Sequence, residues 1–398
     1  MFGTTQQTTQ GNEREKRDTV RDRRAFIKDV GCLTAGIVMS DGLVGATARS
    51  LQSGGAGSRR QVVIGGRRVK TIDVHTHCYV LEVMPLVEGH EWGSLVRAAA
   101  AKTRGIRLTP DVIGPERVQW MDEHGIDVQV LSINPYWHTA ERELATRLIA
   151  VQNEALAAAC AKFPGRFVGF ASVAMQHPDL AARQLEDAMK MGMPGAALAC
   201  NVAGDELANP RFDPFWVKVE ELSALIFIHP QPEGRFNGKR YPAGMDERLS
   251  GYGNLGNTIG NPLETTIAFS HLIFEGTLDK FPGLRICGGH GGGFLPSYVG
   301  RSDASCEWIA RGCKPLKKKP SEYFKEQLLC DSLVFNSEEL RLRVAQYGVG
   351  QVVLGTDHPA PWPVRGVDHV LETASLSDTD KIAILGGNLS KLLRIPQF

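Results

Sequence analysis

Residues 71–80 read TIDVHTHCYV and place His75 and His77 one residue apart, after the apolar residues Ile72 and Val74. In an extended strand, side chains two positions apart lie on the same face, so the two imidazoles point the same way. Such a pair can hold one metal ion. Two polar residues closing a surface strand would give the same pattern, so the rest of the sequence has to distinguish these interpretations.

The composition is that of an ordinary soluble globular protein. The chain has 398 residues, 42% hydrophobic and 22% charged, and a net charge of +1. This charge balance gives no indication of binding to nucleic acid. Barrel domains can run past about 250 residues as one unit, so the length predicts one catalytic domain, residues 49–398, after a removable leader.

The first 48 residues carry the features of an export signal in the expected order. RRAFIK, beginning at Arg23 and Arg24, resembles the twin-arginine consensus, and the apolar run VGCLTAGIVM that follows is too short to span a bilayer. Residues 46–48, ATA, then supply a small-residue cleavage site. We expect the twin-arginine machinery to export the folded, metal-loaded protein to the periplasm. A basic tail without a signal function is the alternative.

The cysteines do not indicate a disulfide framework. The chain has 8 cysteines, and removing the leader takes Cys32 and leaves 8 − 1 = 7, with no C-x-x-C pair. An odd number without paired spacing predicts neither a disulfide scaffold nor a zinc ribbon. Cys78 lies beside His77 and could line a site, although a free cysteine more often packs as a small buried hydrophobic residue.

Apolar runs alternate with amphipathic stretches beyond residue 60. Helical patterns such as ATRLIAVQNEALAAACAKF and PDLAARQLEDAMKMG separate eight predicted strands. The predicted strands are residues 71–75, 127–132, 167–173, 195–199, 225–229, 284–289, 330–335 and 352–355. Eight β-α units predict a (β/α)8 barrel. A doubly wound sheet is the second possibility, but the first strand is not followed by a glycine-rich dinucleotide fingerprint.

Polar residues follow several of these strands, at the end where barrel enzymes carry their sites. His75 and His77 close the first strand, His229 closes the fifth, and Asp357 follows the eighth. Three imidazoles and a carboxylate suit one divalent ion, best Zn²⁺, with Mn²⁺ or Fe²⁺ as alternatives.

His290 follows the sixth strand within GGHGGG. We place it outside the ligand set, because the flanking glycines let the backbone approach a ligand and leave the imidazole free to move protons. A flexible loop or a phosphate cradle would be the other interpretation of this segment, but the Lys-Ser/Thr of a P-loop is missing.

From about residue 71 to 396 the chain resembles the amidohydrolase superfamily, in the branch with aminocarboxymuconate-semialdehyde decarboxylase and several hydroxybenzoate decarboxylases. The matching segments are IDVHTH, MDEHGIDVQVLS, FPGRFVGFASV, NPRFDPFW, IFIHP, ETTIAFSHLIFEGTLDKFPGLRICGGHGGGFLPSYVGR and VVLGTDHP. The resemblance implies a distorted barrel, metal on His75, His77, His229 and Asp357, a catalytic His290 and a homodimer. The fourth strand (PGAALACN) lacks the bridging lysine of dinuclear relatives, which implies one metal ion.

The sequence departs from the family pattern in places. His358 stands where relatives often have tyrosine and adds an imidazole beside the site, and His271 is unusual within its helix. Arg107 and Arg301 are candidate anchors for a substrate carboxylate, and an ordinary solvated arginine is the alternative for each.

Together with these residues, the resemblance implies a metal-dependent nonoxidative decarboxylase of a small carboxylated aromatic or muconate-like substrate. Loss of CO₂ leaves negative charge on a carbon atom, which a divalent ion stabilises and which His290 or Asp357 can protonate. In the alternative, a hydrolase, the metal would acidify a water molecule, Asp357 would take its proton, and a lactone, ester or amide would be cleaved. A noncatalytic metal-binding protein is the third possibility.

Overall fold

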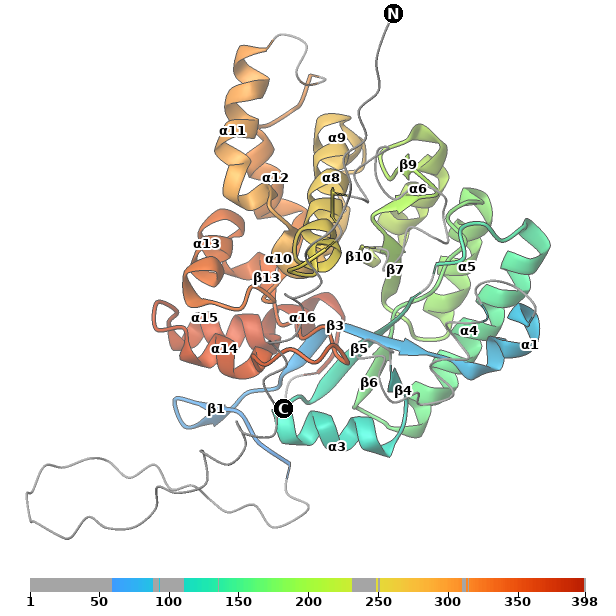
Figure 1. The fold of residues 1–398 in the computed structure, drawn as a ribbon, viewed down its shortest axis with the longest axis horizontal. Coiled ribbons are helices and arrows are strands. Elements are labelled where there is room, and N and C mark those ends of the chain that lie inside the picture. Colours follow the sequence, from blue (N-terminus) through green and yellow to red (C-terminus); the bar gives the residue numbers. More distant parts are fainter. Residues whose placement is uncertain are drawn as a thin grey trace, which may run out of the picture. The chain divides into compact units, whose positions relative to one another are not determined.

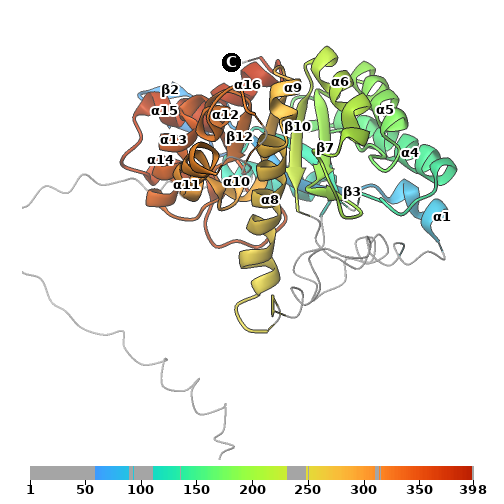
Figure 2. The same ribbon diagram turned by 90° about the horizontal axis from the view of Figure 1, so that it is seen from above.

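Eight parallel strands, in two sheets joined by isolated bridges, form the barrel of the computed structural model. Figures 1 and 2 show the strands at the centre with helices around them. The structure describes residues 59–88, 93, 111–134, 136–230, 248–249, 251–309, 313 and 315–396. The barrel strands are β3 (Ile72–Tyr79), β5 (Val128–Ile133), β6 (Phe167–Gly169), β7 (Gly195–Ala199), β10 (Leu225–His229), β11 (Arg285–Gly288), β12 (Leu328–Asp331) and β13 (Val352–Val353). The predicted (β/α)8 architecture is confirmed.

Two seams, where regular pairing gives way to isolated bridges, distort the barrel. Between β6 and β7 a single parallel bridge joins Ala171 to Ala196. Between β13 and β3 a bridge joins Thr76 to His358, and the Asp357 N–H donates to the His75 carbonyl over 2.8 Å. The second seam therefore fixes the backbone of the first strand directly against the segment that carries Asp357.

Helices separate the strands and cover the outside of the barrel (Figure 1). The larger ones are α3 (Pro115–His124), α4 (Arg142–Lys162), α5 (Pro178–Lys190), α6 (Asp213–Leu222), α8 (Asn261–Phe274), α11 (Leu295–Trp308) and α13 (Ser337–Tyr347). Shorter helices are α1 (Met84–Val87), α9 (Thr277–Lys280), α12 (Pro320–Glu326), α14 (Gly366–Glu372), α15 (Asp378–Ile382) and α16 (Asn388–Leu392). Both helices predicted from quoted patterns are present, as α4 and α5. No helix of the described part of the chain is long and apolar enough to cross a membrane.

Short strands lie outside the barrel order. β1 (Val63–Ile64) and β2 (Arg67–Arg68) form an antiparallel hairpin, as do β8 (Asn201–Val202) and β9 (Asp205–Glu206). β4 (Asp111–Val112) pairs in parallel with β3.

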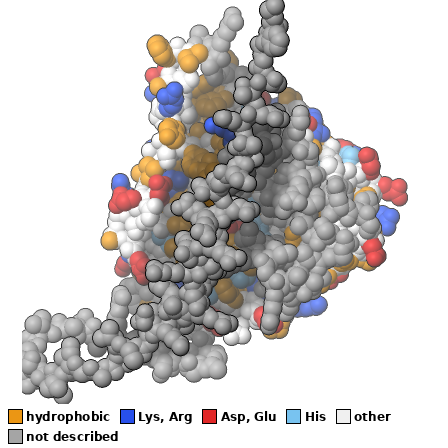
Figure 3. Space-filling view, in the orientation of Figure 1, with side chains coloured by type: hydrophobic (Ala, Val, Ile, Leu, Met, Phe, Trp, Pro, Cys, Tyr) orange, Lys and Arg blue, Asp and Glu red, His pale blue; other side chains and the backbone are white. Residues whose placement is uncertain are grey.

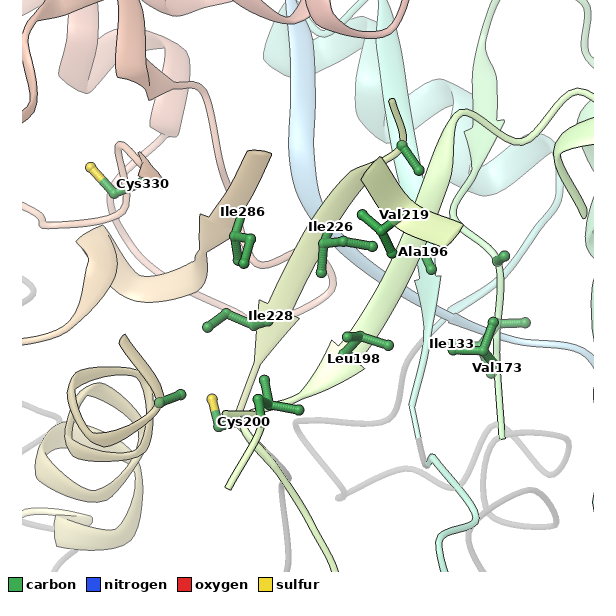
Figure 4. Close-up of a cluster of buried hydrophobic side chains, with 14 of the residues drawn as sticks. Ile133, Val173, Ala196, Leu198, Cys200, Val219, Ile226, Ile228, Ile286 and Cys330 are labelled. Atoms are coloured by element: carbon green, nitrogen blue, oxygen red, sulfur yellow. The ribbon is translucent and has the colours of Figure 1, made fainter. Parts of the chain in front are cut away.

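The core has two layers because side chains alternate along each strand. In β10, Leu225 and Phe227 pack inside the barrel, whereas Ile226 and Ile228 pack against the helices. Figure 4 shows part of the outer layer, with Ile226 and Ile228 beside Leu198 of the neighbouring strand. His229 continues the inward series of Leu225 and Phe227 and therefore enters the barrel at its carboxyl end.

The seventh strand was placed too late by the sequence pattern. The prediction was 330–335, and the observed strand ends at Asp331. The side chain of Asp331 accepts a hydrogen bond from the N–H of Leu333, two residues later, over 3.1 Å. This local bond forms a turn and stops the strand, so Leu333 and Val334 lie beyond it. Asp331 consequently lies at the carboxyl end, among the site residues.

The structure also contains a disulfide, Cys306–Cys313, at the end of α11. The cysteine spacing predicted no disulfide scaffold, and it did not predict this single bond.

The leader expected at residues 1–48 lies outside the described residues.

Candidate metal centre

A bulge in β3 turns His75 and His77 toward the barrel interior. Ile72 and Val74 pack inside the barrel, so strict alternation would point His75 outward. The pairing of β3 with β5 shifts register between Asp73 and Thr76, where β3 has one residue more than its partner. This extra residue inverts the alternation. Cys78 accordingly packs outward against the helices and does not line the site.

Four side chains from the strands β3 and β10 and from the loop after β13 converge on one point. One ligand atom from each of His75, His77, His229 and Asp357 lies within 4.8 Å of the others, and all four residues are buried. The Asp357 Oδ1 atom lies 3.0 Å from the His77 Nε2 atom and 3.2 Å from the His75 Nε2 atom. This is the set predicted from the sequence, and it forms a divalent metal site.

Hydrogen bonds on the far side of two rings direct their Nε2 atoms to the centre. The Asp331 carboxylate lies 2.6 Å from the His75 Nδ1 atom. The Ser132 hydroxyl donates to the Thr76 carbonyl and lies 3.1 Å from the His77 Nδ1 atom, which therefore donates to it. Both Nδ1 atoms carry protons in this arrangement, so both Nε2 atoms are the ones that face a cation at the centre.

The third histidine also fits a cation. His229 Nε2 is buried and has no hydrogen-bond partner among the described residues. Its Nδ1 atom lies 3.4 Å from the amide nitrogen of Asn134, whose own amide oxygen is likewise without a partner. Turning this amide over would aim the oxygen at an Nδ1–H of His229 and leave Nε2 for the metal. Ser132 and Asn134 were not predicted from the sequence.

Asp357 is held on both sides. Its Oδ2 atom accepts a hydrogen bond from the indole N–H of Trp362 over 2.9 Å, while Oδ1 points at the histidines. Its backbone has a positive φ of 60°, an uncommon conformation for aspartate that is typical of functional sites. The carboxylate therefore presents a single oxygen to the metal centre.

The charges of these groups are strongly coupled. Burial disfavours the protonated form of His75, but the carboxylates of Asp357 and Asp331 outweigh this effect and raise its pKa to about 10. Burial opposes ionisation of Asp357, yet His75 and His77 hold its pKa well below the usual range. Burial lowers the pKa of His77 and His229. The centre thus holds a proton on His75 that a cation would displace.

His290 lies beside this centre without joining it. Its ring centroid is 5.0 Å from those of His75 and His229, and neither ring nitrogen has a hydrogen-bond partner among the described residues. Burial and the positive charge at His75 lower the pKa of His290 to about 4. The imidazole is therefore neutral near pH 7 and has both nitrogens available.

The glycines around His290 are required for a different reason from the one predicted. The prediction is that they let the backbone approach a ligand, but the protein's own atoms occupy the space beside them. A Cβ atom at position 292 would lie 2.1 Å from the Tyr347 hydroxyl, and one at position 293 would lie 2.4 Å from the Pro262 carbonyl. At Gly289 a Cβ would lie 3.2 Å from the His75 ring. These contacts leave no room for side chains other than that of His290.

The remaining predicted residues that the structure describes are not part of the ligand set. Arg107 lies outside the described residues, and Arg301 is exposed on α11. His358 packs its ring 3.8 Å from that of Trp120, centroid to centroid, rather than joining the ligands. His271 of α8 pairs with Glu275, the residue that follows this helix. The roles of the two arginines as carboxylate anchors stay predictions.

Comparisons with known proteins identify sequences and folds that are similar to this chain. The amidohydrolase family model matches residues 72–395. The 2-amino-3-carboxymuconate-6-semialdehyde decarboxylase of Dictyostelium discoideum is 30% identical over 340 residues, which cover 81% of this chain and 91% of the relative.

Two solved structures are similar over the same region. The 5-carboxyvanillate decarboxylase of Sphingomonas paucimobilis superposes with a TM-score of 0.72 at 26% identity, covering 82% of this chain and 100% of the other. The dihydroxybenzoic acid decarboxylase of Polaromonas sp. JS666, solved with manganese and the inhibitor 2-nitroresorcinol, has a TM-score of 0.68 at 28% identity. This match covers 82% of this chain and 97% of the other.

Proposed function

Because the chain belongs to the amidohydrolase family, we propose that it is a metal-dependent nonoxidative decarboxylase of a small carboxylated aromatic or muconate-like acid. The observation that carries this proposal is the unpaired imidazole of His290, 5.0 Å from the rings of His75 and His229. Decarboxylation needs a proton donor beside the metal, and His290 has that position without belonging to the ligand set.

Different residues would bind the metal and donate the proton. His75, His77, His229 and Asp357 would hold the cation. A divalent cation in this position supplies positive charge that stabilises the electrons left when the bond to the carboxyl carbon breaks. Those electrons remain on the substrate carbon, CO₂ leaves, and a proton from His290 or Asp357 forms the new C–H bond. An anionic substrate near His290 raises the pKa of the ring and favours its protonated, donating form.

We propose one divalent ion, and its identity is open to measurement. Three imidazoles and one carboxylate predict Zn²⁺. The Polaromonas relative binds manganese. Elemental analysis of the purified protein distinguishes these two ions.

We also propose a homodimer, in which Arg301 would lie at the interface between the two copies. Tyr298 and Trp308 are 63% and 89% exposed on α11, and their spacing from Arg301 places all three on one side of the helix. Hydrophobic side chains gather in the part of Figure 3 where Figure 1 places α11. Burying such a patch against a second copy is a favourable way to remove it from water, and it would carry Arg301 into the interface.

Export to the periplasm by the twin-arginine machinery is the remaining proposal. RRAFIK, the short apolar run and ATA support it in the sequence. The Cys306–Cys313 disulfide is compatible with it, because disulfides persist in oxidising compartments.

The decarboxylase proposal is tested with metal-loaded protein and a panel of dihydroxybenzoates, 5-carboxyvanillate and 2-amino-3-carboxymuconate-6-semialdehyde. We expect CO₂ release from at least one acid and none after chelation of the metal. Cleavage of lactones or esters without CO₂ release would support a hydrolase instead. Bound metal without turnover of any compound would indicate a binding protein.

A further inference from the structure

The Asp331 carboxylate is fully buried and accepts hydrogen bonds from four directions. Its Oδ2 atom lies 2.6 Å from the His75 Nδ1 atom and 3.0 Å from the backbone nitrogen of His290. Its Oδ1 atom lies 2.7 Å from the backbone nitrogen of Gly291 and 3.1 Å from that of Leu333. Asp331 thus contacts both a metal ligand and the turn that carries His290.

All four partners are donors, which only an ionised carboxylate can satisfy. The three backbone groups are N–H groups, and His75 must carry its proton on Nδ1 when Nε2 binds a cation. A carboxamide of the same shape has one oxygen and one NH₂ group. In either orientation, its NH₂ group would face two of these donors and leave them buried without an acceptor.

The turn that Asp331 holds is conformationally strained. His290 has φ 56° and ψ 47°, a left-handed conformation that is unfavourable for a residue with a Cβ atom. On the other side of this turn, the buried guanidinium of Arg343 donates to the carbonyl of Gly291 over 2.7 Å and to that of Gly293 over 3.2 Å. Arg343 therefore stabilises the turn but does not contact His75, whereas Asp331 contacts both the turn and His75.

We propose that Asp331 is a positioning residue that fixes, with one carboxylate, the metal-facing orientation of His75 and the turn that presents His290. It links the metal centre to the proton donor and sets the distance between them. The part of this inference that concerns His290 as proton donor rests on the proposed function, and the part that concerns His75 does not.

Metal affinity tests whether Asp331 holds His75 in its metal-facing orientation. Metal-free Asp331→Asn protein is titrated with Mn²⁺, and the free ion is followed by electron paramagnetic resonance. We expect the affinity to fall by about 10- to 100-fold, the usual effect of removing an outer partner of a ligating histidine. An affinity equal to that of the wild type would overturn the proposal.

Two matched variants separate positioning from general damage. Arg343→Gln loosens the turn without touching His75 and should keep its Mn²⁺ affinity. Asp127→Asn removes another buried carboxylate, which accepts from the Thr71 N–H over 2.9 Å just before β5. This variant should lose stability and keep its affinity. If Asp127→Asn weakens Mn²⁺ binding as much as Asp331→Asn does, the effect is general and the proposal fails.

Turnover tests whether Asp331 holds the turn that presents His290. At saturating Mn²⁺, Asp331→Asn and Arg343→Gln should both lower kcat on the acid identified by the decarboxylation panel, with little change in KM. In a His290→Asn background, the Asp331 substitution should have no further effect on kcat. An undiminished effect in that background would show that Asp331 does not act through His290.

Two measurements decide the proposal without a substrate. The Gly291 amide should exchange its hydrogen slowly in the wild type and much faster in Asp331→Asn, and equal rates would contradict the turn assignment. If Asp331→Asn does not fold, the ¹⁵N spectrum of the wild type with Zn²⁺ replaces it. His75 should then show a protonated Nδ1 and a metal-bound Nε2, and an unprotonated Nδ1 would overturn the proposal. Failure of the acid panel alone would count against the proposed function and leave these results standing.

Discussion

The His77 Nε2 atom lies 3.0 Å from the Asp357 Oδ1 atom, although 280 residues separate the two in the chain. The bulge in β3 and the seam between β13 and β3 produce this contact. Two lone-pair donors so close together, in a site shielded from water, need a proton or a cation between them.

Substitution of a ligand should empty the metal centre. His75→Ala, His229→Ala and Asp357→Ala should each purify with less than about a tenth of the wild-type metal, because three donors remain and one of the four positions is lost. His290→Ala is the matched control and should keep its metal and lose turnover. Metal content is measured by mass spectrometry of the elements. Full occupancy in the first three variants would mean that the ligand set is wrong.

Metal binding should release a proton at pH 7. The pKa of His75 is raised to about 10 without a cation, so the ring holds its proton at all lower pH values. A cation at Nε2 displaces that proton. The apparent affinity should therefore rise about tenfold per pH unit between roughly pH 6.5 and 8.5.

Calorimetric titration of metal-free protein with Zn²⁺, in buffers of different ionisation enthalpy, counts the protons released. We expect about one per ion, and the same number for His290→Asn. A count of zero would show that His75 is neutral before the metal binds.

Gly195 should be indispensable to the barrel. It pairs with Leu225, and a Cβ atom there would lie 1.8 Å from the Leu225 carbonyl oxygen, which is backbone and cannot move aside. Gly195→Ala should lower the free energy of unfolding by about 3 kcal/mol or more. Gly350→Ala has open space around its Cβ and should change it by less than about 0.5 kcal/mol. Urea denaturation that cannot tell the two variants apart would refute this interpretation of the β7–β10 pairing.

The leader prediction is independent of the site. Arg23→Lys combined with Arg24→Lys should leave the precursor in the cytoplasm, because the twin-arginine receptor reads this pair. Fractionation of cells that express both forms, followed by immunoblotting, measures the distribution. A conservative change elsewhere in the leader, Lys28→Arg, is the control and should not alter export. Periplasmic protein in equal amounts from all forms would argue for another signal or none.

The four ligands could be predicted from the sequence because they end apolar runs or follow them closely. His229 closes LIFIH, and Asp357 follows VVLG. Parallel strands bring their carboxyl ends to one edge, so the positions alone indicate proximity. The prediction for His75 and His77 was correct for an incomplete reason, since their inward direction depends on a bulge. A bulge depends on pairing with β5, which one segment cannot reveal.

The outer partners were missed for reasons that differ between residues. Asp331 was assigned to the beginning of a strand that in fact ends there, because LVF after it looked like its continuation. An aspartate followed by serine is a turn signal that could have corrected the boundary. Ser132 and Asn134 follow the inward alternation of β5, but serine and asparagine at a strand end are too common to single out. The Cys306–Cys313 bond has a spacing that predicts no specific site.

Decarboxylation in D₂O by the wild type and by His290→Asn tests directly whether His290 is the proton donor. The amide preserves approximate shape and hydrogen bonding and loses the titrating group, so the variant should keep its metal and its stability. The wild type should place deuterium on the carbon that loses CO₂, and the variant should do so roughly 100-fold more slowly, the scale of a missing general acid. Nuclear magnetic resonance of the product measures both. Equal rates in the two proteins, with metal retained, would contradict the assignment of His290 as the proton donor.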